Sequence, residues 1–224
     1  MTYRALVLGA TGAVGSALTR ELLASTTCAQ VIALVRRPTP LFDALPGKEK
    51  LKALVVDLGQ LEQETARVGA GCEAAFCTMG VGQPRKVGAD EHWRVDVEYA
   101  GAFARGAKVA GTRHISLLSA VGANRTSMWR YSRVKGAAEA AVAGAGIART
   151  SMFRPSLLVT QEIRYGLQDR LTQAIFPVVS LVMPSVLHEV TVETLGRAMR
   201  VNAERPGGPG LEILQYPEFR ALQA

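Results

Sequence analysis

Residues 3–18 read YRALVLGATGAVGSAL, and this stretch decides the fold. Arg4–Leu8 has the apolar composition of a buried strand, and Ala13–Ala24 has the composition of a helix. Three glycines with different roles, Gly9, Gly12 and Gly15, lie between the strand and the helix and in the first turn of the helix. The first permits a tight turn from strand to helix, the second lets a pyrophosphate approach the backbone, and the third lets the helix pack close to the sheet. The spacing predicts a dinucleotide phosphate site at the N-terminus of the first helix, formed by Gly9, Thr11, Gly12, Ala13, Val14 and Gly15.

The same alternation of apolar runs and helical stretches continues along the chain. Further strands are predicted at Val31–Val35, Leu51–Val56, Ala74–Thr78, His114–Leu118 and Ile147–Phe153. Helices are predicted at Glu91–Ala110 and Tyr131–Ala145, with a short one after Leu58. The strands show little polar alternation, as expected when both faces of a strand are covered. Strands alternating with such helices predict right-handed crossovers, and therefore a Rossmann-like, doubly wound parallel α/β sheet with helices on both faces.

The alternation weakens after Arg154-Pro155, where we expect a small region on the substrate or partner side. This region covers about residues 156–210, with helices predicted near Tyr165–Phe176 and at Thr191–Asn202, and Glu212–Gln215 is expected to add a last strand. No linker or repeat divides the chain, so residues 1–224 are expected to form one domain.

Composition excludes several classes of protein. With 48% hydrophobic residues in 224, the chain is too apolar to remain disordered. Its three cysteines, Cys28, Cys72 and Cys77, are an odd set without paired spacing, which favours reduced thiols and a cytoplasmic location over a disulfide scaffold. The first eight residues do not resemble a secretory leader. The longest apolar stretch, Ala174–Leu187, is too short for a bilayer span and contains two prolines, so only peripheral membrane contact stays open.

The net charge of +7 raises the question of nucleic acid, but the basic residues are scattered rather than clustered. The densest pair, Arg36-Arg37, follows the second strand, where NAD-specific folds place an acid for the ribose 2′-OH. Two guanidinium groups instead suit a 2′-phosphate. We therefore expect a small phosphorylated ligand, NADP(H) in preference to NAD(H), with NAD(H) still possible. The alternative is that both arginines are ordinary solvated turn residues.

Other cofactor contacts are predicted at strand ends, because ligands gather at the carboxyl edge of such sheets. Asp57 and Leu58 close the third strand and are placed at the adenine edge. Cys77, Thr78 and Met79 close the fourth and are placed under the adenosine ribose. The loop after them resembles a cover over the cofactor, with Arg85 and Lys86 as candidate phosphate contacts.

A second constellation carries acid–base chemistry. Tyr131 and Lys135 are four residues apart and share a face of a predicted helix, and Ser119 stands twelve positions earlier, after the fifth strand. A free phenol, with a pKa of about 10, is a poor proton donor or acceptor at neutral pH. A neighbouring ammonium lowers the pKa of a phenol toward the working range. Ser119 would hold a substrate carbonyl oxygen beside the phenol. The alternative is a helix-face aromatic with a solvated lysine.

The segments GATGAVG at 9–15, LLSAVGAN at 117–124, YSRVKG at 131–136 and FRPSLL at 153–158 resemble the short-chain dehydrogenase/reductase family, and its atypical, Tat-interacting-protein-like branch in particular. The resemblance covers residues 1–160 well and the remainder loosely. It implies that Ser119, Tyr131 and Lys135 form a catalytic triad, that Lys135 also contacts the nicotinamide ribose, and that Pro155, Ser156 and Leu157 border the carboxamide. Many active members carry an asparagine relay on the preceding helix, and this sequence offers Asp96 there.

Two functions follow as hypotheses. The first is an NADP(H)-dependent oxidoreductase acting on an unidentified carbonyl or alcohol. The alternative is an NADP(H)-binding regulatory or scaffold protein with little turnover, as some atypical members are. A sugar-nucleotide epimerase is disfavoured by the short C-terminal region. No metal is expected, since His92, His114 and His188 are far apart in the sequence, and a structural role is favoured for His188. The predicted helices at 91–110 and 131–145 are candidates for a homodimer contact.

Overall fold

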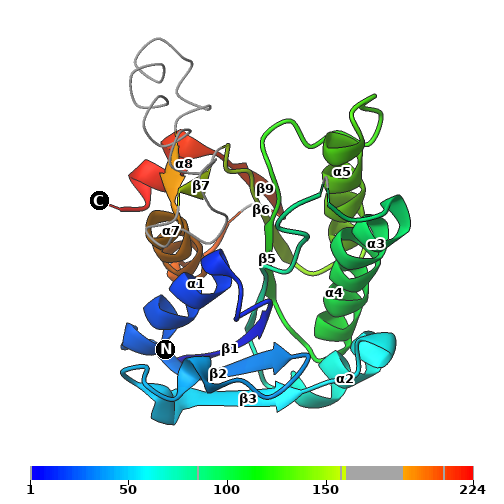
Figure 1. The fold of residues 1–224 in the computed structure, drawn as a ribbon. Helices are drawn as coiled ribbons and strands as arrows, with labels where there is room; N and C mark the ends of the chain where they lie inside the picture. Colours follow the sequence, from blue (N-terminus) through cyan, green and yellow to red (C-terminus); the bar gives the residue numbers. More distant parts are fainter. Residues whose placement is uncertain (1, 85, 157, 160–188, 209, 224) are drawn as a thin grey trace.

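The computed structural model describes residues 2–84, 86–156, 158–159, 189–208 and 210–223, and it is built on one parallel sheet (Figure 1). The strands lie in the order β3-β2-β1-β4-β5-β6-β9, and every neighbouring pair is parallel. Their bounds are β1 Tyr3–Leu8, β2 Cys28–Val35, β3 Leu51–Val55, β4 Ala74–Cys77, β5 His114–Leu118, β6 Arg149–Phe153 and β9 Leu211–Leu214. The predicted doubly wound α/β fold is confirmed.

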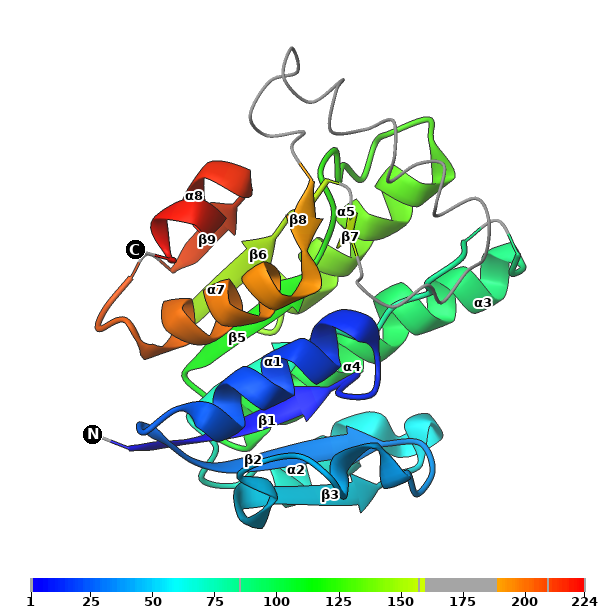
Figure 2. The same cartoon turned by 60° about the vertical axis from the view of Figure 1, so that its left-hand side comes forward.

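Helices cover both faces of this sheet (Figure 2). One face carries α1 (Ala13–Ala24) and α7 (Val192–Glu204), and the other carries α2 (Leu61–Val68), α4 (Tyr99–Val109) and α5 (Arg130–Ala143). Alternate residues of β1 serve the two cores: Ala5 and Val7 pack in the cluster of α1 and α7, while Leu6 and Leu8 pack in the opposite one. This central strand is apolar throughout because both of its faces are covered.

The strand order reverses between β1 and β4. From β1 the chain first adds β2 and β3 on one side, and then crosses to β4, β5 and β6 on the other. In open α/β sheets, ligands bind at such a switch point, outside the carboxyl ends of the strands. The glycine turn follows β1, so it lies at this position.

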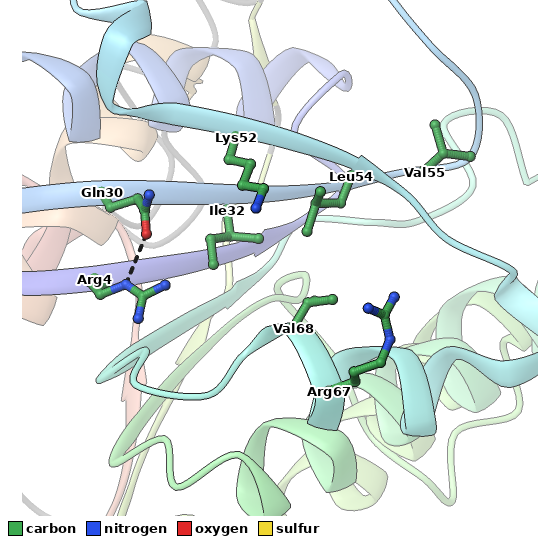
Figure 3. Close-up of a pocket in the computed structure, with 8 residues that line it drawn as sticks. All are labelled: Arg4, Gln30, Ile32, Lys52, Leu54, Val55, Arg67 and Val68. Atoms are coloured by element: carbon green, nitrogen blue, oxygen red, sulfur yellow. Dashed lines mark hydrogen bonds between the residues drawn. The ribbon is translucent and has the colours of Figure 1, made fainter.

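Several boundaries differ from the predictions. β2 begins at Cys28, and β6 begins at Arg149 rather than Ile147. Strand β3 lies at the sheet edge and exposes Lys52, Ala53 and Val55, so the expectation that all strands are covered is wrong there. A pocket of about 420 Å³ lies between this edge of the sheet and α2, and Arg4, Lys52 and Arg67 are among the residues that line it (Figure 3).

The predicted helix at 91–110 is confirmed as one helical run, but its middle turn is π-helical. It consists of α3 (Ala89–Trp93), a π-helical turn at Arg94–Glu98 and then α4. Single π-helical turns inside helices are rare and often mark functional sites, since the extra residue redirects the side chains around it. Here the turn carries Asp96.

The C-terminal part adds elements that the sequence did not indicate. α8 (Tyr216–Ala221) follows β9, and β7 (Leu158–Val159) pairs with β8 (Val190–Thr191). The predicted helix near 165–176, the apolar stretch 174–187 and His188 lie outside the described residues. No helix in the described part of the chain is both long and apolar enough to cross a bilayer.

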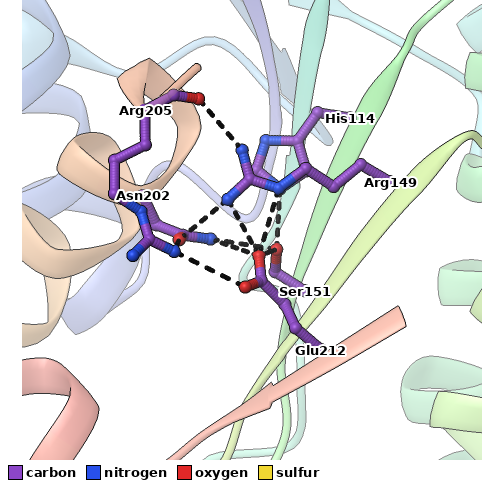
Figure 4. Close-up of polar contacts among 6 residues, drawn as sticks. All are labelled: His114, Arg149, Ser151, Asn202, Arg205 and Glu212. Carbon is purple, nitrogen blue, oxygen red and sulfur yellow. Dashed lines mark hydrogen bonds and ion pairs between the residues drawn. The ribbon is translucent and has the colours of Figure 1, made fainter. Parts of the chain in front are cut away.

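A polar network joins α7 and β9 to the sheet at its N-terminal edge (Figure 4). The Arg149 guanidinium donates to Glu212 and to Asn202, each at 2.9 Å, and Ser151 donates to the same carboxylate. Burial alone would raise the pKa of Glu212, but hydrogen bonds from Ser151, Asn202 and Arg149, together with the Arg149 charge, outweigh it and hold that pKa below its usual range. The network holds the last strand in place, at the end of the sheet opposite the glycine turn.

Candidate cofactor and catalytic site

The structure brings the predicted cofactor residues to one edge. Since all seven strands are parallel, the loops that follow them lie at the same carboxyl end of the sheet. That edge receives the residues after β1, β2, β3, β4 and β6, which are the positions predicted from strand ends. Of the predicted residues, Leu157 and the loop residue Arg85 lie outside the described part of the chain.

The three glycines have different surroundings, as the motif requires. Gly9 has φ +89°, and a Cβ there would lie 2.5 Å from the Met79 nitrogen. A Cβ at Gly15 would lie 2.1 Å from the Gly9 oxygen and 2.6 Å from Thr78 Oγ1. Among the described residues, a Cβ at Gly12 would meet only the Gly9 oxygen, at 3.3 Å. Gly9 and Gly15 therefore allow the turn and the packing, whereas Gly12 borders open space.

The N-terminus of α1 fits an anion. Gly12 is the N-cap, and it has no side chain to accept from the first N–H groups of the helix. The first turn, Ala13 to Ser16, contains no acid. Its N–H groups and the positive end of the helix dipole therefore face the space beside Gly12. A pyrophosphate group matches both the space and the charge.

The adenosine side shows a polar, exposed rim. Arg36 and Arg37 follow β2, and both are exposed without a hydrogen bond or ion pair to any described residue. Asp57 accepts a hydrogen bond from the Gly59 nitrogen at 2.8 Å, and Leu58 beside it is half-buried.

The end of β4 forms the floor between the two sides. Thr78 Oγ1 donates to the Leu8 oxygen at 3.1 Å, which ties this floor to β1, and Met79 is half-buried. Burial raises the pKa of the Cys77 thiol to about 12, so this side chain acts as a small apolar residue.

The acid–base pair lies on α5. Tyr131 is 41% exposed and Lys135 is buried, with the Lys135 Nζ 5.9 Å from the Tyr131 ring centroid. The Lys135 Nζ lies 2.7 Å from Asp96 Oδ1. Burial alone would lower the pKa of Lys135, but the charges of Asp96 and Tyr131 outweigh it and hold that pKa above its ordinary value. Lys135 is therefore a buried ammonium that the Asp96 carboxylate stabilises.

Asp96 joins this pair to the loop after β4. Its Oδ2 accepts the Val81 N–H at 2.8 Å, and its side chain is 1% exposed. A Cβ built on Gly80 would lie 3.1 Å from Asp96 Oδ1 and 3.3 Å from the Lys135 Nζ, so the backbone after β4 passes directly against the pair. Asp96 thus lies where the sequence predicted a relay residue, and its function there stays a prediction.

Sequence reasoning set His92 aside, yet the structure places it in this cluster. Its ring stacks on that of Tyr131, with centroids 6.2 Å apart and planes at 21°, and its Nε2 is 3.9 Å from Asp96 Oδ2. The imidazole is fully buried, and neither ring nitrogen has a hydrogen-bond partner among the described residues. Burial lowers the pKa of His92, so the ring is neutral at pH 7. The sequence could have indicated this contact, because His92 and Asp96 are four residues apart in a predicted helix.

The Ser119 hydroxyl forms its hydrogen bond with Glu139 and not with Tyr131. This hydroxyl donates to Glu139 Oε1 at 2.5 Å, and Arg154 binds both oxygens of that carboxylate, at 2.8 and 2.6 Å. Glu139 stands four residues after Lys135 on the same face of α5, and this spacing is the signal by which the sequence could have indicated it. The structure shows no hydrogen bond between Ser119 and Tyr131, both of which are described.

The loop after β6 closes the far side of the edge. Pro155 is buried, and its carbonyl accepts the Val121 N–H at 2.9 Å, while Ser156 is half-buried. In the described part of the chain no three His, Cys, Asp or Glu side chains gather as they would around a metal ion. The three cysteines are free and buried.

The site has matching relatives. The sequence profile of the NAD(P)H-binding family matches residues 9–173. Protein HTATIP2 of Rattus norvegicus is 34% identical over 211 residues, covering 93% of this chain and 84% of that protein. Mitochondrial protein FMP52 of Eremothecium gossypii is 30% identical over 155 residues, covering 69% of this chain and 66% of that protein.

Solved structures agree on the fold. MoeE5 in complex with UDP-glucose and NAD has a TM-score of 0.71 at 18% identity, covering 97% of this chain and 80% of that chain. The family match makes the cofactor a nicotinamide dinucleotide. The chain belongs to the NAD(P)H-binding family, within the atypical, Tat-interacting-protein-like branch of the short-chain dehydrogenase/reductases.

Proposed function

We propose that the protein is an NADP(H)-dependent oxidoreductase that interconverts a carbonyl and an alcohol on a small-molecule substrate. The observation that carries this proposal is the placement of Tyr131 beside the buried ammonium of Lys135, at the edge that also holds the open phosphate cradle at Gly12. The chain works as one nucleotide-binding domain, with residues 156–210 on the substrate side.

The proposed cofactor contacts follow the edge in order. Gly9, Thr11, Gly12, Ala13, Val14 and Gly15 hold the pyrophosphate; Arg36 and Arg37 hold the 2′-phosphate; Asp57, Leu58, Cys77, Thr78 and Met79 line the adenosine half. Lys135, Pro155, Ser156 and Leu157 border the nicotinamide half. When bound, the nicotinamide supplies or accepts a hydride. Two exposed arginines without protein partners support the preference for NADP(H) over NAD(H).

The proton is assigned to Tyr131. Its phenol donates to the substrate oxygen when a carbonyl is reduced, and the Lys135 ammonium then stabilises the negative charge left on the phenol oxygen. Asp96 keeps Lys135 charged and fixed. Ser119 orients the substrate oxygen. In the observed geometry its single hydrogen goes to Glu139, so it offers the substrate only acceptor lone pairs.

One observation favours the second candidate, an NADP(H)-binding regulator with little turnover. A serine whose hydrogen is committed to Glu139 does not polarise a carbonyl, so the constellation would then mainly hold the cofactor. The same test separates the two candidates.

The compartment is also part of the proposal. Three free, buried cysteines are compatible with a reducing, cytoplasmic location. The FMP52 relative is named mitochondrial. The scattered basic residues support a small-molecule substrate rather than nucleic acid, and α4 and α5 are the proposed surface for a homodimer.

The test replaces Tyr131 by Phe, with Tyr99→Phe as the matched control on the neighbouring helix. NADPH oxidation is followed with a panel of aldehydes, ketones and quinones, and NADPH binding is titrated separately. Tyr131→Phe should lower turnover by at least about a hundredfold, the low end for loss of a general acid. Its NADPH affinity should stay within about threefold, under 1 kcal/mol. Tyr99→Phe should change neither.

Two results would change the conclusion. If Tyr131→Phe keeps the wild-type turnover, the phenol is not the proton donor. If NADPH binds tightly and no carbonyl on the panel reacts, the regulator is the better function.

A further inference from the structure

The ion pair of Asp96 and Lys135 lies on the nicotinamide side of the switch point. With the pyrophosphate at Gly12, the half of a dinucleotide that lies toward β2 meets Arg36 and Arg37, and the other half crosses β4, the neighbour of β1 on the opposite side. The pair stands against the backbone just past β4, at Gly80 and Val81. A ligand half that crosses β4 therefore approaches Lys135 and Asp96.

Asp96 and Lys135 form a buried ion pair with no net charge. The Lys135 side chain is 10% exposed and the Asp96 side chain is 1% exposed, and the Lys135 Nζ lies 2.7 Å from Asp96 Oδ1. The second oxygen of Asp96 accepts the Val81 N–H, as a carboxylate does. An uncompensated ammonium at such depth would act strongly on its surroundings, because solvent and salt screen it little.

The other titratable groups near this pair add no buried charge. Tyr131 is 41% exposed, and burial raises the pKa of the Cys77 thiol to about 12, so this thiol is uncharged at pH 7. His92 is neutral, because burial lowers the pKa of its ring. The Arg130 guanidinium is exposed and donates to the Pro84 oxygen at 2.7 Å. Glu98, at the end of the π-helical turn, is exposed. Among the described residues, Asp96 is thus the group that balances Lys135.

The net charge of the Asp96–Lys135 pair matters because the oxidised and reduced cofactors differ by one charge at the nicotinamide ring. The nicotinamide ring is cationic when oxidised and neutral when reduced. A lone Lys135 would repel the oxidised form specifically, whereas a balanced pair would not.

We propose that Asp96 sets the redox-state preference of the site: by balancing the charge of Lys135, it lets the oxidised, cationic cofactor bind without the repulsion that an unpaired lysine would impose. This inference rests on the proposed function, since it requires the cofactor to lie along this edge. It assigns Asp96 a role in electrostatics that an asparagine at the same position would not have.

The test measures dissociation constants of NADP⁺ and NADPH by calorimetry and needs no substrate. The quantity compared is the ratio of the NADP⁺ constant to the NADPH constant. Asp96→Asn should raise this ratio by about threefold or more, a modest effect for one unit charge at several ångströms in a partly dry site. Lys135→Met leaves the carboxylate alone and should lower the ratio. The Asp96→Asn, Lys135→Met double variant is neutral again and should return within about twofold of wild type.

The controls separate charge from shape. Glu98→Gln removes an exposed acid of the same turn and should leave the ratio unchanged. Thermal melts check folding, and the neutral double variant keeps the comparison available if one single variant unfolds. If Asp96→Asn weakens both forms equally, the residue only positions the loop and the inference is wrong. A change in the same direction for Asp96→Asn and Lys135→Met also overturns it. If the wild type binds neither nucleotide, the proposed function fails first.

Discussion

A methyl group added at Gly12 should weaken cofactor binding, whereas the same group added at Gly15 should lower the stability of the fold. A Cβ at Gly15 would stand 2.1 Å from the Gly9 oxygen and 2.6 Å from Thr78 Oγ1, so backbone must move. At Gly12 the Gly9 oxygen, at 3.3 Å, is the only atom of the described part of the chain that the methyl group meets, and the local φ of −74° suits any residue. Gly15→Ala should therefore damage the fold, and Gly12→Ala should damage phosphate binding.

The magnitudes follow from these contacts. Overpacking a rigid site costs about 1–3 kcal/mol or more, and alanine recovers up to about 1 kcal/mol as the better helix former. With a backbone oxygen at 2.1 Å, we expect a net loss of about 2 kcal/mol for Gly15→Ala, or about 4–8 °C in Tm for a chain of this size. Gly12→Ala should stay within about 1 kcal/mol of wild type in stability. It should weaken NADPH binding at least about tenfold, or 1.4 kcal/mol.

Thermal melts with and without NADPH measure both effects. At 100 times its dissociation constant a ligand adds about 2.7 kcal/mol to the apparent stability. Wild type should therefore show a clear upward shift in Tm, and Gly12→Ala should show at most about half of it at the same NADPH concentration, because a tenfold weaker ligand adds only about 1.4 kcal/mol. The reasoning is refuted if Gly12→Ala keeps the full shift, or if Gly15→Ala melts at the wild-type temperature.

Two further predictions concern charge. Wild type should bind NADPH at least about tenfold more tightly than NADH. The double variant Arg36→Ala, Arg37→Ala should lose that preference and keep its NADH affinity within about twofold of wild type. We expect the two arginines to contribute only about 1.4 kcal/mol to NADPH binding, because both are exposed to solvent. Equal affinities in wild type would contradict the NADP(H) assignment. Burial lowers the pKa of His114 to about 3, so the fold keeps neutral a ring that the unfolded chain protonates below about pH 6.5. Stability should therefore fall by about 2 kcal/mol between pH 7 and pH 5, and urea unfolding of His114→Gln should show a correspondingly smaller fall; identical slopes would show that this ring is not the cause.

The sequence predicted best what depends on short-range chemistry. The glycine turn and β1 were readable because tight turns, phosphate approach and double-sided burial each restrict residue type. β5 matches its predicted bounds, His114–Leu118, for the same reason. The exposure of β3 was not readable, because an edge position is a property of the whole strand order rather than of the strand itself.

The candidate site was only partly predictable. The spacing of Tyr131 and Lys135 placed them on one helical face, and the structure agrees. The π-helical turn at Arg94–Glu98 has no such signal, and it is the element that carries Asp96 beside His92 and toward Lys135. Contacts that join different elements depend on how those elements pack, which local spacing does not encode.

Ser119 shows how such a contact changes the chemistry inferred from a motif. From its position alone, the hydroxyl was expected to donate to a substrate carbonyl. The structure gives its hydrogen to Glu139, whose carboxylate Arg154 also holds at 2.6 and 2.8 Å. To donate elsewhere, Ser119 must leave a hydrogen bond to a buried charged group, worth about 1.5–3 kcal/mol. A hydroxyl on the substrate can instead donate to Ser119 at no such cost. That hydroxyl has only one hydrogen, and the proposed proton transfer needs it at Tyr131. Ser119 and Tyr131 can therefore hold the substrate oxygen together, in either direction of the reaction, only when Ser119 leaves Glu139.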